Sequence, residues 1–178
     1  MNLSYHHEYR LRHRDGSMRW VTESGRGVHD EAGQVLWIDG VLMDNTDSKA
    51  RNAEFVGTVN AINRAMAVID YSMDGLILQA NQNFLNHFGY TQEEIQGLHF
   101  RIFCLNSEAS YEEDAAMWQQ LQQGQFVTRE CQAVTKDGRI IWVETSFNPI
   151  LNASGNPFRI TQLLTDITAR RSLSQALL

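Results

Sequence analysis

The stretch KDGRIIWVETS at residues 136–146 decides the fold, because a similar stretch, RDGSMRWVTES, occupies residues 14–24. A shift of 122 positions, from Arg14 to Lys136, aligns the two stretches without a gap. The agreement continues beyond them and reaches a DNT triplet in the first copy and a DIT triplet in the second. Self-similarity of this length indicates that one structural unit is present twice.

Each copy is predicted to form a three-stranded antiparallel meander. The pairs Asp15–Gly16 and Asp137–Gly138 supply the positive-φ position of a tight hairpin turn. Apolar and polar residues alternate on both sides of these turns, which is typical of strands with one buried face. The predicted strands are residues 5–14, 17–30 and 35–46 in the first copy, and 125–135, 140–151 and 157–168 in the second.

Only the second copy is preceded by segments that would cover its apolar face. Two further strands are predicted at 67–71 and 76–81, and three short helices follow them. The expected fold class is therefore α+β, with a five-stranded antiparallel sheet and short helices on one face. A truncated unit of three strands precedes this domain.

The boundaries of the helices are indicated by capping signals. Thr91 with Glu94, and Ser110 with Glu113, have the spacing of capping boxes that begin helices. Three glycines are expected to end the helices: Gly89, Gly97 and Gly124. The last helix has an apolar stripe of three residues: Met117, Trp118 and Leu121.

This order of elements resembles a PAS domain, the sensor fold of bacterial signalling proteins. The resemblance rests on DGLILQANQNFLNHFGYTQEEIQG at 74–97, TKDGRIIWVETSFNPILNASGNPF at 135–158, and TDIT at 165–168. It implies four segments: the C-terminal strand half of a first PAS domain at 1–47, a linker helix at 48–60, a complete PAS domain at 61–168, and the start of an exit helix at 169–178. A half sheet exposes an edge and an apolar face, so we expect the linker helix, a second copy of the chain or a different packing to cover it.

The resemblance is strongest to bacterial chemoreceptors and aerotaxis-type transducers, and it implies a non-catalytic sensory module. Input to a diguanylate cyclase or histidine kinase, and a ligand-free dimerisation module, are the alternatives. The PAS region and its flanking helices imply a homodimer, with an exit helix that either transmits a signal or only connects. No P-loop, GxSxG or HExxH motif indicates an enzyme.

Composition adds expectations about partners and location. A formal charge of −6 argues against nucleic-acid binding. No apolar run approaches the roughly 20 residues that span a bilayer, so a cytoplasmic segment is expected, although its parent protein could be attached to a membrane. Cys104 and Cys131 lack metal-ligand spacing, so we expect two reduced thiols and no metal site.

The candidate ligand site is the pocket that this fold forms between its sheet and its short helices. Either a small-molecule ligand occupies it, held by polar groups and buried by aromatic rings, or its residues form a filled core. The residues chosen for it are Asn81, Asn83, Phe88, Trp118, Trp142 and Gln162, with Phe84, Thr145 and Phe147 beside them.

The resemblance leaves the cofactor open between FAD, heme and none. Flavin-binding redox PAS domains carry Trp and Asn where this chain has Phe126 and Ala133. Heme-binding PAS domains need an imidazole at the pocket, and only His87 and His99 lie in the preceding segments. Neither cofactor is supported by a full motif.

Overall fold

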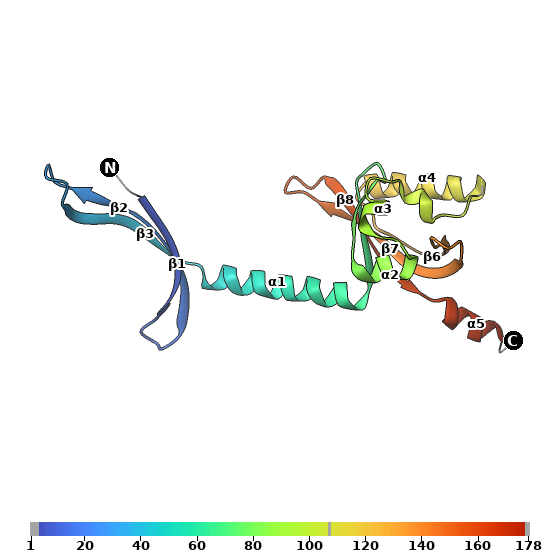
Figure 1. Cartoon of the computed structure of the whole chain (residues 1–178), viewed down its shortest axis with the longest axis horizontal. Coiled ribbons are helices and arrows are strands. Elements are labelled where there is room, and N and C mark those ends of the chain that lie inside the picture. The colour runs from blue at the N-terminus through green and yellow to red at the C-terminus, as the bar shows by residue number, and fades with distance from the viewer. Residues whose placement is uncertain (1–3, 107, 177–178) are drawn as a thin grey trace. The chain divides into compact units, whose positions relative to one another are not determined.

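The computed structural model describes residues 4–106 and 108–176, and the chain divides into two compact units, residues 1–60 and 61–178 (Figure 1). In the first unit, β1 (Ser4–Arg12), β2 (Met18–His29) and β3 (Val35–Asp44) form an antiparallel sheet in the order β1-β2-β3. The helix predicted over 48–60 is α1, which runs from Thr46 to Ala65.

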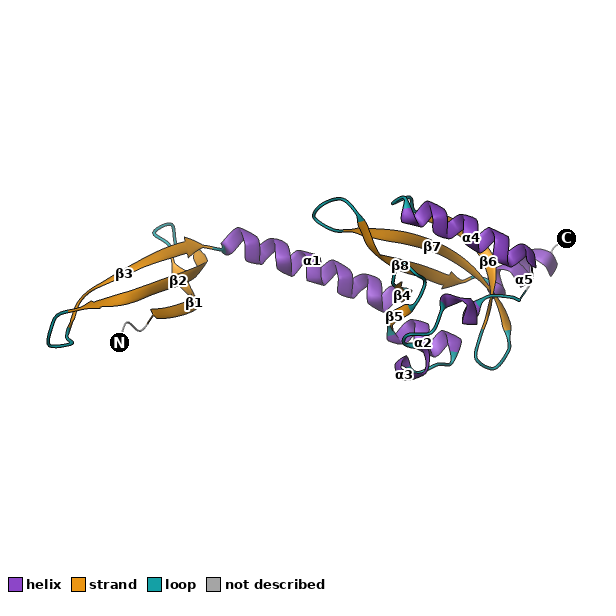
Figure 2. Cartoon of the chain, turned by 90° about the horizontal axis from the view of Figure 1, so that it is seen from above, coloured by secondary structure: helices purple, strands orange, loops and turns teal. Residues whose placement is uncertain are grey.

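The second unit is a five-stranded sheet with helices packed on it, which confirms the predicted α+β fold. The strand order is β5-β4-β8-β7-β6, and every neighbouring pair is antiparallel. Helix α4 lies along β7, and α2 packs on β4 (Figure 2). The elements are β4 (Ala67–Tyr71), β5 (Ile77–Ala80), α2 (Gln82–Phe88), α3 (Gln92–Ile95), the 3₁₀ helix η1 (Phe100–Phe103), α4 (Glu108–Gln122), β6 (Val127–Val134), β7 (Ile140–Leu151), β8 (Pro157–Asp166) and α5 (Thr168–Ala176).

Capping signals in the sequence predict where α2 ends and where α3 begins, but they place the start of α4 wrongly. Helix α2 ends at Gly89, whose φ of 78° is left-handed, and the predicted capping box at Thr91 begins α3. The predicted cap at Ser110 is wrong, because α4 begins at Glu108 and Ser110 lies inside it. Glutamate and alanine are good helix formers, so the two residues before Ser110 extend the helix upstream.

The core of the second unit lies between the sheet and the helices. Ile69 and Ile160 on the sheet and Leu121 on α4 are completely buried. Phe84 and Phe88 on α2 are 1% and 2% exposed, and their rings stack with centroids 4.4 Å apart. Burial of large apolar side chains on both layers fixes the helices on the sheet.

The sequence repeat is also a repeat of hydrogen bonds where each meander meets the helix after it. The Trp20 amide donates to Thr46 Oγ1 at 2.9 Å, and the Trp142 amide donates to Thr168 Oγ1 at the same distance. In return the Trp20 and Trp142 carbonyls each accept an amide hydrogen bond of 2.8 Å from the residue before the threonine. The two tryptophans therefore occupy matched environments, as the repeat predicts.

Each copy has a carboxylate at the start of the helix. The Thr46 amide donates to Asp44 Oδ1 at 2.9 Å, and the Thr168 amide donates to Asp166 Oδ1 at 2.8 Å. A carboxylate at this position satisfies an unpaired amide and complements the helix dipole. We call the set Trp142, Asp166 and Thr168 the exit clasp, and the set Trp20, Asp44 and Thr46 the entry clasp.

The predicted hairpin turns are matched as well. Gly16 and Gly138 have φ of 88° and 81°, which an L-residue adopts only with strain. Hydrogen bonds from Ser17 lower the pKa of Asp15 to about 2, and hydrogen bonds from Thr135 and Arg139 lower that of Asp137 to about 2.

The sheet of the first unit has an uncovered apolar strand. The apolar side chains of β3 are between 54% and 63% exposed, and they are Val35, Leu36, Trp37, Ile38, Val41, Leu42 and Met43. Helix α1 contains no buried residue, so the linker helix, one of the three expected covers, does not cover this sheet, and a different packing stays a prediction. Cover by a second copy stays a prediction. Among the described helices, none is long and apolar enough to span a membrane.

Candidate functional site

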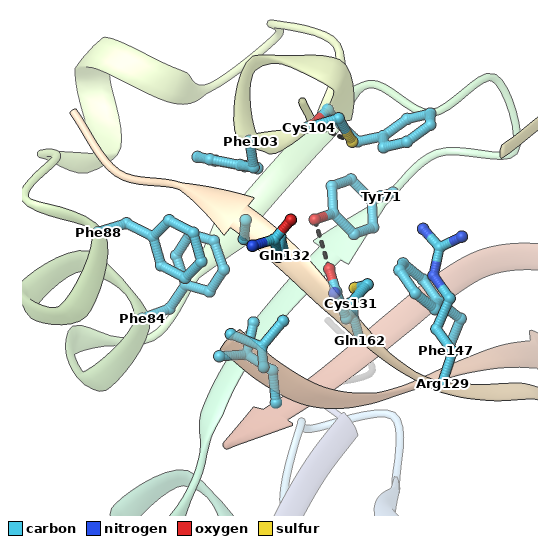
Figure 3. Close-up of a pocket in the computed structure, with 14 residues that line it drawn as sticks. Tyr71, Phe84, Phe88, Phe103, Cys104, Arg129, Cys131, Gln132, Phe147 and Gln162 are labelled. Carbon is cyan, nitrogen blue, oxygen red and sulfur yellow. Dashed lines mark hydrogen bonds between the residues drawn. The ribbon is translucent and has the colours of Figure 1, made fainter. Parts of the chain in front are cut away.

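A small cavity lies in the second unit between the sheet, α2 and η1 (Figure 3). It offers about 40 Å³ to solvent-sized molecules, and most of its wall is aromatic or aliphatic. A single water needs roughly 10–15 Å³ by this measure, whereas pockets for drug-sized ligands measure about 300–1,000 Å³. The cavity as it stands therefore accommodates a few waters or a molecule of similar size.

Four of the residues chosen from the sequence do line this cavity. Phe84 and Phe88 reach it from α2, and Phe147 and Gln162 reach it from the sheet. Thr145 lies beside them, bonded to Gln162. Whether these residues bind a ligand stays a prediction.

Trp118 packs behind the cavity wall. Its ring meets Tyr71 edge-on, with centroids 6.2 Å apart, and lies 5.0 Å from the Phe100 ring. Both of these partners line the cavity. Trp118 thus supports the lining from outside.

Asn81, Asn83 and Trp142 do not line this cavity, so the expectation that they point into it is wrong, although Trp142 does line a neighbouring surface pocket. The Asn81 carboxamide caps α2, accepting the Phe84 amide at 3.0 Å. Asn83 donates to backbone carbonyls at the end of α1. Trp142 precedes the inward-facing Val143 on β7, so its side chain lies on the opposite face of the sheet. There the Arg171 guanidinium carbon lies 3.7 Å from the centroid of the Trp142 ring.

The polar groups inside the cavity bond to one another. Tyr71 donates its hydroxyl to Gln162 Oε1 at 2.7 Å, and Gln162 Nε2 donates to Thr145 Oγ1 at 2.9 Å. The Thr145 hydroxyl in turn donates a hydrogen bond to the Leu163 carbonyl at 3.0 Å. Complete burial raises the pKa of Tyr71 well above its usual value, so the phenol stays a neutral donor. This chain fixes the orientation of the Gln162 amide.

Sequence reasoning missed an ion pair at the edge of the cavity. Arg129 on β6 lines the cavity, and its Nη2 lies 2.9 Å from Oδ1 of Asp114 on α4, whose side chain is 3% exposed. The Asp114 Oδ2 and Arg129 Nε atoms are buried, and neither has a hydrogen-bond partner among the residues that the structure describes. The alternation of side chains along β6 could have indicated that Arg129 faces inward, because Arg129 shares a face of this strand with the buried Ala133.

The same ion pair separates the cavity from a surface pocket of about 280 Å³. Four residues line both spaces: Cys104, Arg129, Cys131 and Gln132. Burial raises the pKa of Cys104 to about 12 and also raises that of Cys131, so both thiols stay protonated.

The residues present do not fit a heme. His87 Nε2 lies 3.3 Å from Asp166 Oδ2, and the ring of His99 packs on Phe100 with centroids 4.7 Å apart. Neither imidazole lines the cavity, and the two cavity thiols are protonated. The cavity is also far smaller than a flavin ring system requires. Among the described residues, no group of three or more His, Cys, Asp or Glu is placed to hold a metal ion.

Comparison with known families matches both units. A PAS domain model matches residues 64–169, and a PAS fold model matches residues 2–42. A crystal structure of a PAS domain from Colwellia psychrerythraea superimposes with a TM-score of 0.57 at 21% identity, covering 65% of this chain and 98% of that one. These matches confirm the resemblance that the repeated hairpin indicates.

Two longer relatives are similar along almost the whole chain. The biofilm dispersion protein BdlA of Pseudomonas aeruginosa is 29% identical over 163 residues, which cover 92% of this chain and 39% of BdlA. The oxygen sensor protein DosP of Escherichia coli is 24% identical over 170 residues, which cover 94% of this chain and 21% of DosP. The chain thus spans less than half of either relative.

Proposed function

The chain belongs to the PAS domain family, and on that premise we propose that it is a non-catalytic input region of a bacterial chemotaxis-type signalling protein. The cavity of the second unit is its sensing site, and α5 carries the response toward an output domain. A homodimer formed by the PAS units and their flanking helices is part of this proposal. The exit clasp is the observation that supports it most strongly.

The exit clasp lies directly behind the cavity wall. Val143 and Leu164 line the cavity, and Val143 pairs with Asp166 across β7 and β8. The clasp residues Trp142 and Asp166 are thus the neighbours of cavity residues on the same two strands, and they bond to the first residue of α5. A change in the cavity that shifts β7 against β8 would change these bonds.

The relatives support a sensory role and leave the output open. DosP is named as an oxygen sensor and BdlA as a biofilm dispersion protein. Input to a diguanylate cyclase or a histidine kinase fits the same fold, and the sequence after Leu178 in the parent protein separates these outputs from a chemotaxis-type one.

The small cavity favours a second candidate, a ligand-free dimerisation module. Empty space of only about 40 Å³ is close to what the well-packed core of a purely structural domain leaves. In that case changes inside the cavity would leave α5 unaffected, whereas the sensory proposal requires α5 to respond.

The first test removes the threonine of the exit clasp. Thr168→Ala leaves the Trp142 amide without its acceptor, at a cost of about 1–2 kcal/mol. We expect faster hydrogen–deuterium exchange at the Arg171 amide, which bonds to the Ile167 carbonyl. A cost of 1.4 kcal/mol corresponds to about tenfold in exchange rate.

The repeat supplies the matched control. Thr46→Ala removes the same contact from the entry clasp, and it should leave Arg171 exchange unchanged. Unchanged exchange at Arg171 in Thr168→Ala would show that the clasp does not hold α5, and the proposed route to the exit helix would be rejected.

A further inference from the structure

Helix α2 presents two different faces, each with a pair of residues four positions apart. Phe84 and Phe88 point into the cavity, and their stacked rings form part of its wall (Figure 3). Asn83 and His87 form the other pair. Asn83 contacts the end of α1, and His87 contacts Asp166 of the exit clasp at the start of α5. Residues i and i+4 lie on one side of a helix, so each pair marks one face of α2.

The N-terminal end of α2 holds the C-terminal end of α1, which we call the entry helix because it leads into the second unit. Asn83 Nδ2 lies 3.0 Å from the carbonyls of Asn63 and Arg64, and 3.2 Å from that of Met66. Asn81 Nδ2 donates to the Met66 carbonyl at 2.9 Å. The last carbonyls of a helix have no partner within it, so these two amides provide the C-terminal cap of α1.

The C-terminal end of α2 holds the start of the exit helix. His87 Nε2 lies 3.3 Å from Asp166 Oδ2, while the other oxygen of the same carboxylate accepts the Thr168 amide at 2.8 Å. One carboxylate therefore joins α2 to the exit clasp. Although burial opposes it, hydrogen bonds from Thr168 and the nearby His87 lower the pKa of Asp166, so the carboxylate stays charged at neutral pH.

The entry clasp lacks such a link in the described chain. Asp44, the counterpart of Asp166, lies 3.4 Å from Arg19, which is on its own sheet. The contact between α2 and the exit clasp is therefore an addition to the repeated unit and is not required to begin a helix after the meander.

From these contacts we propose that α2 is the element that couples the entry helix to the exit helix, through Asn83 at one end and His87 at the other. The proposal rests on the proposed function, because it assigns the route by which a displacement of α1 reaches α5. The cavity residues Phe84 and Phe88 lie on the same helix, so an occupant of the cavity would act on both links at once. Couplings of this kind amount to about five- to 150-fold in an equilibrium.

The test is a double-mutant cycle in the full chain, read by amide exchange at two positions. The Met66 amide, bonded to the Ile62 carbonyl, reports on the end of α1, and the Arg171 amide reports on α5. We expect Asn83→Ala to speed exchange at both amides by about fivefold or more. In a His87→Ala background, Asn83→Ala should still affect Met66 and should no longer affect Arg171.

Asn86→Ala is the control variant, because Asn86 lies on α2 at the surface and its side chain bonds to Gln82 on the same helix. It should change neither amide. If Asn83→Ala unfolds the domain, Asn83→Ser provides the milder loss of the cap. An unchanged Arg171 rate in the Asn83 variants, or an equal effect with and without His87, would overturn the proposal, even where Thr168→Ala still loosens α5.

Discussion

Replacing Phe88 with alanine should lower the free energy of unfolding of the second unit by about 3–5 kcal/mol. Phe88 is 2% exposed, stacks on Phe84 and contacts Phe103 edge-on, with centroids 5.1 Å apart. Its removal deletes apolar contact area and enlarges a cavity that is already present. Urea unfolding followed by the NMR amide signals of β7 and β8 measures the loss.

Phe126→Ala is the matched control for this prediction. Phe126 is 71% exposed, so the same substitution there should change stability by less than about 0.5 kcal/mol. Equal losses for the two variants would mean that α2 does not seal the cavity. The assignment of Phe88 to the cavity wall would then be wrong.

Replacing Asp114 with alanine should cost about 3 kcal/mol, because it leaves the Arg129 charge inside the domain without its partner. The Asp114 side chain is 3% exposed and that of Arg129 is 24% exposed. Partial exposure of Arg129 places the effect at the lower end of the range for broken buried pairs. Urea unfolding with the same NMR signals measures it.

The double variant Asp114→Leu with Arg129→Met separates two causes of the loss: an unpaired buried charge on Arg129 and the lost side-chain contacts of Asp114. Replacing both charges with apolar groups should restore most of the stability, because a buried ion pair contributes little beyond an apolar pair of similar size. Glu112→Ala, at an exposed position of α4, should have almost no effect. A double variant as unstable as Asp114→Ala would contradict this explanation.

The repeat made the fold predictable from the sequence. Both Asp-Gly hairpins, both tryptophan environments and all five strands of the second unit follow from alternation and turn chemistry, which act over a few residues. Strand parity alone also separates Trp142 from Val143, because neighbouring residues of a strand face opposite sides.

The cavity was only partly predictable, for physical reasons. The sequence predicts Asn81 and Asn83 as polar groups for a ligand, yet the structure uses both amides to cap α1, a contact set by how α1 meets α2. Arg129 and Asp114 meet only because α4 crosses β6, and sequence spacing carries no record of that crossing. Side-chain partners between elements depend on packing, whereas turns and caps depend on neighbouring residues.

The most direct test of the central claim places a small side chain inside the cavity as a fixed occupant. Ala133 is 7% exposed and lines the cavity from β6, so Ala133→Val adds two methyl groups there. Thr128→Val, at an exposed position of the same strand, is the control. The account predicts that Ala133→Val changes exchange at the Arg171 amide by about fivefold or more, with no change in the control. Altered NMR signals at the cavity residues together with an unchanged Arg171 rate would contradict it.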